Sequence, residues 1–242
     1  MPAMSESGAL PEPGTFEPPP TASLHHPLVR ALLALTVTTG LVDITSYVGL
    51  GRVFTANQTG NLVLLAGGIA RSGDLSSAGP LVSLGAYIVG AGAVGLVIRL
   101  GRQRQSTLVV RVLTAEIVLL AIAAILAAVI DVTPGAASGY SEIVMLALAM
   151  GMRTAVISRI GGADVSLTML TGTLAGLAAT LPFTGGSDKH FIRRTGAASA
   201  LFLGAVGGGL MLKASLWLPI AAASVLALFV CVRYARALRE SE

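Results

Sequence analysis

The chain has 242 residues, of which 54% are hydrophobic and only 12% are charged. A soluble globular domain carries about twice that charged fraction, so the composition excludes an ordinary soluble domain and predicts an integral membrane protein. The formal net charge of +4 does not indicate nucleic-acid binding, because aromatic residues make up only 5% of the chain and the basic residues flank apolar runs.

Residues 1–26 form a separate region that is rich in proline and glutamate. Such a composition cannot bury a core, so this tail is predicted to be disordered. It lacks the basic start and early apolar stretch of a signal peptide, so the first apolar run is expected to stay as a membrane helix. Residues 27–242 are predicted to form a single membrane domain.

Eight apolar segments follow in this domain and predict an all-α polytopic fold. They are residues 27–50, 59–70, 80–100, 108–130, 141–157, 165–181, 195–212 and 215–234. The second segment is too short to cross, since a helix of that length spans about 18 Å and the hydrocarbon core is about 30 Å thick. The sixth is equally short when counted from Thr171, although the whole run would just span. We therefore expect about six transmembrane helices plus two short re-entrant or half-helix segments.

The order of features repeats in two halves, about residues 27–130 and 141–236. Gly40 in the first segment is followed by Thr59-Gly60-Asn61 at the start of a short run, as Gly151 is followed by Thr171-Gly172. A helix rich in small residues and then a plain apolar helix complete each half. This order predicts an internal duplication.

Charge placement separates two topologies. If all eight segments cross, the two sides of the membrane receive nearly equal numbers of basic residues. If segments two and six dip in and return, one side holds twelve basic residues and the other three, with Arg153 left inside the membrane. The twelve are Arg30, Arg99, Arg102, Arg104, Arg111, Arg159, Lys189, Arg193, Arg194, Arg233, Arg236 and Arg239, and the three are Arg52, Arg71 and Lys213.

The second topology obeys the positive-inside rule. It predicts cytoplasmic N- and C-termini and places Asp131 and Glu142 outside, in a loop without lysine or arginine. With three crossings in each half, the halves are inverted relative to one another. Inverted repeats with interrupted helices are typical of secondary transporters, whose sites lie near the bilayer midplane.

Asp43 lies well inside the first segment, where an unpaired carboxylate is expensive. It is interpreted as a proton- or cation-coupling group, with a buried acid paired for helix packing as the alternative. Arg153 aligns one position from the counterpart of Asp43. Either the two side chains form a pair across the pseudo-twofold axis, or Arg153 extends to the cytoplasmic face.

Asn57, Thr59, Gly60 and Asn61 form the most polar stretch beside an apolar run. Thr59 is predicted to cap the short helix and leave backbone N–H groups directed at a solute. Ordinary capping with a tight helix contact at Gly60 is the alternative. Thr171 and Gly172 are the second-half counterparts.

Glu116, about one turn inside from Arg111, is expected to extend to the membrane surface or to pair. The glycine-rich helix at 195–212 is expected to form tight helix–helix contacts through Gly204 and Gly208, with a flexible break at 207–209 as the alternative. No metal-ligand spacing, nucleophile–base arrangement or phosphate-binding loop occurs. We therefore expect no cofactor and no enzymatic activity.

The stretch with Gly40, Asp43, Phe54, Asn57 and Thr59-Gly60-Asn61 resembles the YoaK-like family of bacterial membrane proteins, a domain of unknown function. The resemblance covers about residues 28–235 and includes Gly151 and Thr171-Gly172. The family usually has glutamine where Arg153 stands, so no shared role is carried over to Arg153. The resemblance implies a multi-pass protein of the bacterial inner membrane and supplies no substrate.

The sequence thus favours a transporter or channel for a small polar solute or ion. The site residues expected are Asp43, Asn57, Thr59, Gly60, Asn61, Arg153, Thr171 and Gly172. A non-transporting scaffold or partner subunit is the alternative, and an intramembrane enzyme is the third. The expected partners are the lipid bilayer and the unidentified solute, with homo-oligomer formation left open.

Overall fold

The computed structural model describes residues 27–101, 104–161 and 188–240, in which seven helices and no strand occur. The helices are α1 (Pro27–Gly49), α2 (Gln58–Ile69), α3 (Ala78–Leu100), α4 (Gln105–Val129), α5 (Ala137–Gly161), α7 (Asp188–Leu212) and α8 (Trp217–Glu240). All except α2 are long and apolar enough to cross a membrane, which gives 6 candidate spans in the described residues. The prediction of an all-α polytopic membrane protein is confirmed.

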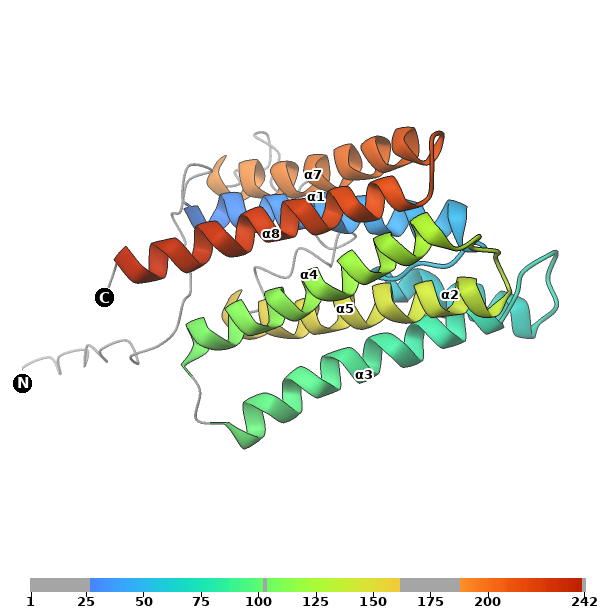
Figure 1. Cartoon of the computed structure of the whole chain (residues 1–242), viewed down its shortest axis with the longest axis horizontal. Helices are drawn as coiled ribbons and strands as arrows, with labels where there is room; N and C mark the ends of the chain where they lie inside the picture. Colours follow the sequence, from blue (N-terminus) through green and yellow to red (C-terminus); the bar gives the residue numbers. More distant parts are fainter. Residues whose placement is uncertain (1–26, 102–103, 162–187, 241–242) are drawn as a thin grey trace, which may run out of the picture.

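The short second segment is also confirmed. The helix α2 has 12 residues, and both α1 before it and α3 after it meet it at the same end of the bundle (Figure 1). The chain therefore enters and leaves α2 without crossing. Its outward face is apolar through Leu62, Val63 and Ile69, which suits contact with lipid. The tail at 1–26 and the segment at 165–181 lie outside the described residues.

The two halves run in opposite directions. In Figure 1, α1 and α4 run from left to right and α3 runs back, whereas α5 and α8 run from right to left and α7 runs in the opposite sense. Each helix of the first half thus points against its counterpart in the second half. This is the inverted arrangement that an odd number of crossings per half requires.

The first helix of each half packs against the last two long helices of the other half. The helix α1 packs against α7 and α8 of the second half, and α5 packs against α3 and α4 of the first. We call these sets the α1 group (α1, α7, α8) and the α5 group (α3, α4, α5). They lie as two layers in Figure 1 and meet where α4 contacts α8.

Equivalent glycines allow the helices of each group to touch. A Cβ on Gly40 of α1 would collide with the carbonyl oxygen of Leu201 in α7, and a Cβ on Gly151 of α5 would collide with that of Tyr87 in α3. Gly40 and Gly151 are 111 positions apart, and Tyr87 and Leu201 are 114 positions apart. The contacts are therefore duplicated residue for residue.

The reciprocal contacts obey the same relation. A Cβ on Gly204 would collide with the carbonyl oxygen of Val37, and one on Gly90 with that of Leu148. Val37 and Leu148 are again 111 positions apart, and Gly90 and Gly204 are 114 apart. The predicted duplication therefore appears as two equivalent helix crossings, and glycines make the close contacts in each.

The predicted tight contact through Gly204 and Gly208 is formed within the chain, since Gly208 faces Leu41 and Ile44 of α1. These glycines are therefore occupied by α1 and do not offer a face to another protein. The alternative of a flexible break at 207–209 is wrong, because α7 is continuous through these residues.

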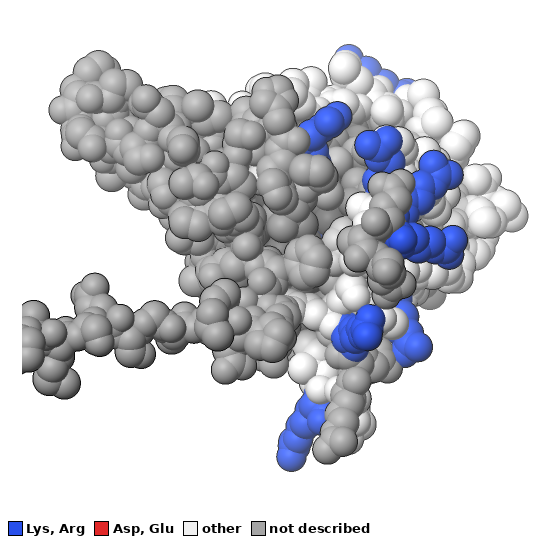
Figure 2. Space-filling view, turned by 90° about the vertical axis from the view of Figure 1, so that its left-hand side faces the viewer, with Lys and Arg blue, Asp and Glu red and all other residues white. Residues whose placement is uncertain are grey.

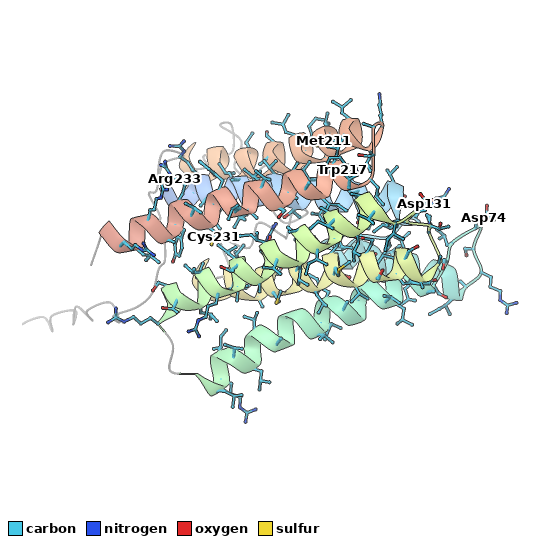
Figure 3. The ribbon with its side chains drawn as sticks, viewed as in Figure 1. Asp74, Asp131, Met211, Trp217, Cys231 and Arg233 are labelled. Carbon is cyan, nitrogen blue, oxygen red and sulfur yellow. The ribbon has the colours of Figure 1, made fainter. Side chains whose placement is uncertain are left out.

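Charge is distributed unevenly between the two ends of the bundle. The end that holds the first turn of α1 and the last turns of α8 carries Arg30, Arg99, Arg104, Arg111, Arg233, Arg236 and Arg239. Figure 2 looks onto this end and shows basic side chains around the described part, with no acidic side chain in view. The acidic Asp74 and Asp131 lie at the opposite end (Figure 3).

Candidate functional site

Asp43 holds the loop between α1 and α2. Its Oδ1 accepts hydrogen bonds from the backbone N–H groups of Thr55 at 3.0 Å and Ala56 at 2.8 Å, and its Oδ2 accepts one from Asn57 at 3.2 Å. The loop can approach because the chain reverses after α1 through Gly51 and Arg52, which have positive φ angles of 95° and 59°. Three donors of this kind compensate a carboxylate that lies in a spanning helix.

Of the two alternatives predicted for Arg153, the pair with Asp43 is not formed in the described structure. No ion pair joins the two side chains, because the carboxylate is engaged by backbone N–H groups and the guanidinium by Glu116. The alternative of a buried acid with a packing role agrees with these contacts.

Asn61 is fully buried and links α2 to the loop and to α3. Its Oδ1 accepts from the backbone N–H of Phe54 at 2.9 Å. Its Nδ2 donates to the carbonyl oxygen of Phe54 at 2.6 Å, to Gln58 Oε1 at 2.8 Å and to Ser83 Oγ at 3.1 Å. Ser83 in turn donates to the same Phe54 carbonyl at 2.6 Å. The hydrogen-bonding capacity of Asn61 is thus used within the protein, as burial requires.

The cap of α2 is Asn57 and not Thr59 as predicted. Asn57 Oδ1 accepts from the N–H of Gly60, and helix α2 begins at Gln58. Thr59 is exposed. Gly60 is needed for packing, because a Cβ there would come within 2.8 Å of the Phe54 ring, which stacks on Tyr47 with ring centroids 4.9 Å apart. The alternative of ordinary capping with a tight contact at Gly60 agrees with this geometry.

The second polar cluster is built on Arg153, which is buried in the middle of α5. Its Nε donates to Glu116 Oε1 at 2.9 Å, and its Nη2 is paired with the same oxygen. Its Nη1 donates to the carbonyl oxygen of Leu35 at 2.9 Å and to Thr39 Oγ1 at 3.1 Å. Arg153 therefore joins α5 and α4 of the α5 group to α1 of the α1 group.

This arrangement decides between the alternatives that were predicted for Arg153 and for Glu116. Arg153 is only 3% exposed, so it does not extend to the cytoplasmic face. Glu116 is fully buried, so it does not extend to the surface; the predicted alternative of pairing is the one that forms, with Arg153 and not with the exposed Arg111. Each charge compensates the desolvation of the other. The Oε2 of Glu116 has no hydrogen-bond partner among the described residues.

Glu142 is a buried acid that the sequence analysis placed outside the membrane. The predicted segment begins at residue 141, which left Glu142 at its edge, whereas α5 begins at Ala137 and places Glu142 in its second turn. Its side chain is 1% exposed, and neither carboxyl oxygen has a hydrogen-bond partner in the described part of the chain. Spacing could have indicated it, because residues 142, 146, 149 and 153 follow one face of a helix.

The remaining predicted site residues, Thr171 and Gly172, lie outside the described residues. The candidate spans of the described part therefore contain three carboxylates, on Asp43, Glu116 and Glu142, and Arg153 as the buried cation. Asp43, Asn57, Gly60 and Asn61 are brought together at one end of the bundle, and Arg153 lies apart from them with Glu116.

Comparison with known proteins agrees with the membrane architecture. A family model described as "Protein of unknown function (DUF1275)" matches residues 31–232. The chain belongs to this family. The match includes all or most of every described spanning helix, and its description names no activity. The predicted resemblance to the YoaK-like family is confirmed by one relative of this chain.

That relative is the UPF0700 transmembrane protein YoaK of Bacillus subtilis (strain 168). It is 31% identical over 211 residues, which is 83% of this chain and 92% of the relative. No solved structure matches the chain. The family is thus established, and any function has to be inferred from the arrangement of the residues.

Proposed function

We propose that the protein passes a small polar solute or ion across the bacterial inner membrane. The observation that carries this proposal is the buried contact of Arg153 with Glu116, Thr39 and the carbonyl oxygen of Leu35. Ionisable groups inside spanning helices are expensive, and where they occur they commonly mark a pathway for ions or substrates.

The position of this contact supports a transport role. It joins the α1 group to the α5 group, which are related by inverted helix directions. In transporters built from inverted repeats, access alternates when one bundle moves against the other around a site near the midplane. Any such movement here must break or rearrange the bonds from Arg153 to Leu35 and Thr39.

The chemistry of the cluster favours a cation or a polar solute with hydrogen-bond donors. Glu116 gives one oxygen to Arg153 and retains Oε2 without a described partner. An acceptor oxygen that is desolvated and directed into the protein interacts more strongly with a donor or cation than one in water. The Asp43 and Asn61 networks, in contrast, satisfy their own groups and are proposed to fix the shape of the loop.

Flux through liposomes that contain the purified full chain tests the proposal. We expect uptake of at least one member of a panel of monovalent cations and small polar solutes, and loss of that uptake with Glu116→Gln. Asp131→Asn is the matched control, because Asp131 is exposed in the loop after α4. Flux equal to that of protein-free liposomes across the panel would contradict the proposal.

We infer further that the arginine-rich end faces the cytoplasm, in agreement with the positive-inside rule. Both the start of α1 and the end of α8 lie there (Figure 1). Single cysteines at positions 71, 104 and 131, in a chain with Cys231→Ser, test this orientation in intact cells. We expect an impermeant thiol reagent to label positions 71 and 131 and not 104. Labelling at 104 from outside would reverse the orientation.

A further inference from the structure

Among the buried ionisable groups of the described residues, Glu142 has the fewest hydrogen-bond partners. Its side chain is 1% exposed, and both of its carboxyl oxygens lack a hydrogen-bond partner there. Asp43 has three backbone donors and Glu116 has Arg153. The three intramembrane acids thus occupy different environments, although all are carboxyl groups in spanning helices.

Glu142 lies inside the protein and not at its rim. Glu142 is five positions after Ala137, the first residue of α5, so it lies about 7.5 Å along the helix from that end. It shares a buried face of α5 with Leu146, Ala149 and Arg153, which are all at most 3% exposed. Along that face Arg153 is about 17 Å further on. Glu142 is therefore placed between the acidic end of the bundle and the Glu116–Arg153 pair.

The helices packed against α5 bring no compensating charge to Glu142. They are α3, α4 and α1, and no described donor on them lies within hydrogen-bond distance of either oxygen. Other titratable and charged side chains lie on these helices and in the loops at the Glu142 end. They are Arg30, Asp43 and Tyr47 on α1, Tyr87 and Arg99 on α3, Arg111 and Glu116 on α4, and Arg52, Arg71, Asp74, Asp131 and Lys213 in loops.

An ionised carboxylate in this environment would lack both solvent and a counter-ion, which is far more costly than burial of the neutral acid. We propose that Glu142 is a proton-binding site that links proton movement to the passage of solute. The inference rests on the proposed transport function and names the proton as the coupled ion. The described packing holds Glu142 with its proton, and loss of the proton favours an arrangement in which water reaches α5.

The link between proton and movement follows from differential binding. A conformation that buries Glu142 binds the proton more tightly than one that hydrates it, so protonation shifts the population toward the packed arrangement. The same face of α5 carries Arg153, whose bonds to Leu35 and Thr39 join the two helix groups. A change in α5 at Glu142 is therefore transmitted along one helix to the contact between the groups.

The protonation state is tested by infrared difference spectroscopy on the full chain in lipid nanodiscs at neutral pH. Subtraction of the Glu142→Gln spectrum from the wild-type spectrum should show loss of a protonated-carboxyl C=O band. Glu116→Gln is the matched control, because Glu116 is paired with Arg153 and its substitution should remove a carboxylate band. Loss of a carboxylate band with Glu142→Gln would overturn the proton site.

A second variant keeps the test valid if Glu142→Gln does not fold. Glu142→Asp retains the acid and should retain a protonated-carboxyl band at a changed frequency. An unchanged spectrum in this variant would also overturn the inference.

Uptake into liposomes then separates this inference from the proposed function. We expect a pH gradient to drive uptake at least tenfold above the rate without a gradient in the wild type, and the gradient to have no effect in Glu142→Gln. Wild-type uptake that does not change with the pH gradient would overturn the proton coupling but would not contradict the proposed transport. A protonated Glu142 without any uptake would overturn transport and leave the proton site.

Discussion

The two halves of the molecule share their helix crossings but not their polar chemistry. Gly40 and Gly151 make equivalent backbone contacts, and so do Gly90 and Gly204. Asp43 of the first half, however, has Thr154 as its counterpart 111 positions later, and Arg153 and Glu142 belong to the second half alone. A duplicated scaffold therefore carries a site that is not duplicated. The glycine crossings are thus common to both halves, whereas the buried charged side chains differ between them.

The largest effect expected is on the buried ion pair. Arg153→Gln leaves Glu116 buried without a counter-ion and should lower the free energy of unfolding by about 3–5 kcal/mol. The double variant Glu116→Gln, Arg153→Gln removes both charges and should be more stable than Arg153→Gln alone. Chemical denaturation of the solubilised protein measures both. A double variant that loses the sum of the two single losses would show that the pair is not coupled.

The next effect concerns the first half alone. Asp43→Ala leaves the N–H groups of Thr55, Ala56 and Asn57 without their acceptor, and should lower the free energy of unfolding by about 2–4 kcal/mol. Asp43→Asn keeps one acceptor oxygen and should lose about half as much. The same denaturation measurement applies, with the exposed Asp131→Ala as control. Equal stability of Asp43→Ala and wild type would refute the role of Asp43 in holding the loop.

Substitutions at the equivalent glycine contacts should lower the free energy of unfolding by similar amounts in the two halves. Gly40→Ala and Gly151→Ala each place a Cβ against a backbone carbonyl and should each lower the free energy of unfolding by about 1–3 kcal/mol. Gly92→Ala is the matched control, since no atom lies within 4 Å of its added Cβ. Melting temperatures in detergent would reveal the ranking. A large loss at only one of the two crossings would contradict the equivalence of the halves.

The smallest effect distinguishes the cap that forms from the cap that was predicted. Asn57→Ala removes the acceptor for the Gly60 N–H and should lower the free energy of unfolding by about 1 kcal/mol. Thr59→Ala changes an exposed side chain and should alter it by less than about 0.5 kcal/mol. Denaturation of both variants in parallel decides between them. A greater loss with Thr59→Ala would restore Thr59 as the cap.

Several features of the site could be predicted from the sequence because they depend on local chain properties. Run length identifies the spanning helices and the short α2, since the bilayer thickness fixes how many residues a crossing needs. Asp43 and Arg153 stand out because charged residues are rare in apolar runs. The polar stretch at 57–61 stands out because it directly precedes an apolar run, and in the structure Asn57 and Asn61 make hydrogen bonds within the chain.

The pairing of these residues could not be predicted in the same way. Arg153 was placed opposite Asp43 by the pseudo-symmetry, yet the guanidinium reaches Glu116, and Asp43 binds the loop at 55–57. The side chain that Arg153 contacts depends on how α4 and α5 are rotated relative to each other. Glu142 was missed because it lies at the edge of the predicted run 141–157, whereas the helix extends four residues further toward the N-terminus and buries its side chain.

The sequence by itself determined that the chain is a multi-pass membrane protein, which of its described segments are long enough to cross, and that its halves are inverted copies. Hydrophobicity, run length and charge placement act along the chain and do not require knowledge of neighbours. Only the tertiary structure decided that α1 and α5 exchange between the halves, that Glu116 and not Asp43 pairs with Arg153, and that Glu142 has no described partner. These outcomes depend on side-chain packing between helices that are far apart in sequence. The pattern of residues within one helix therefore does not predict them.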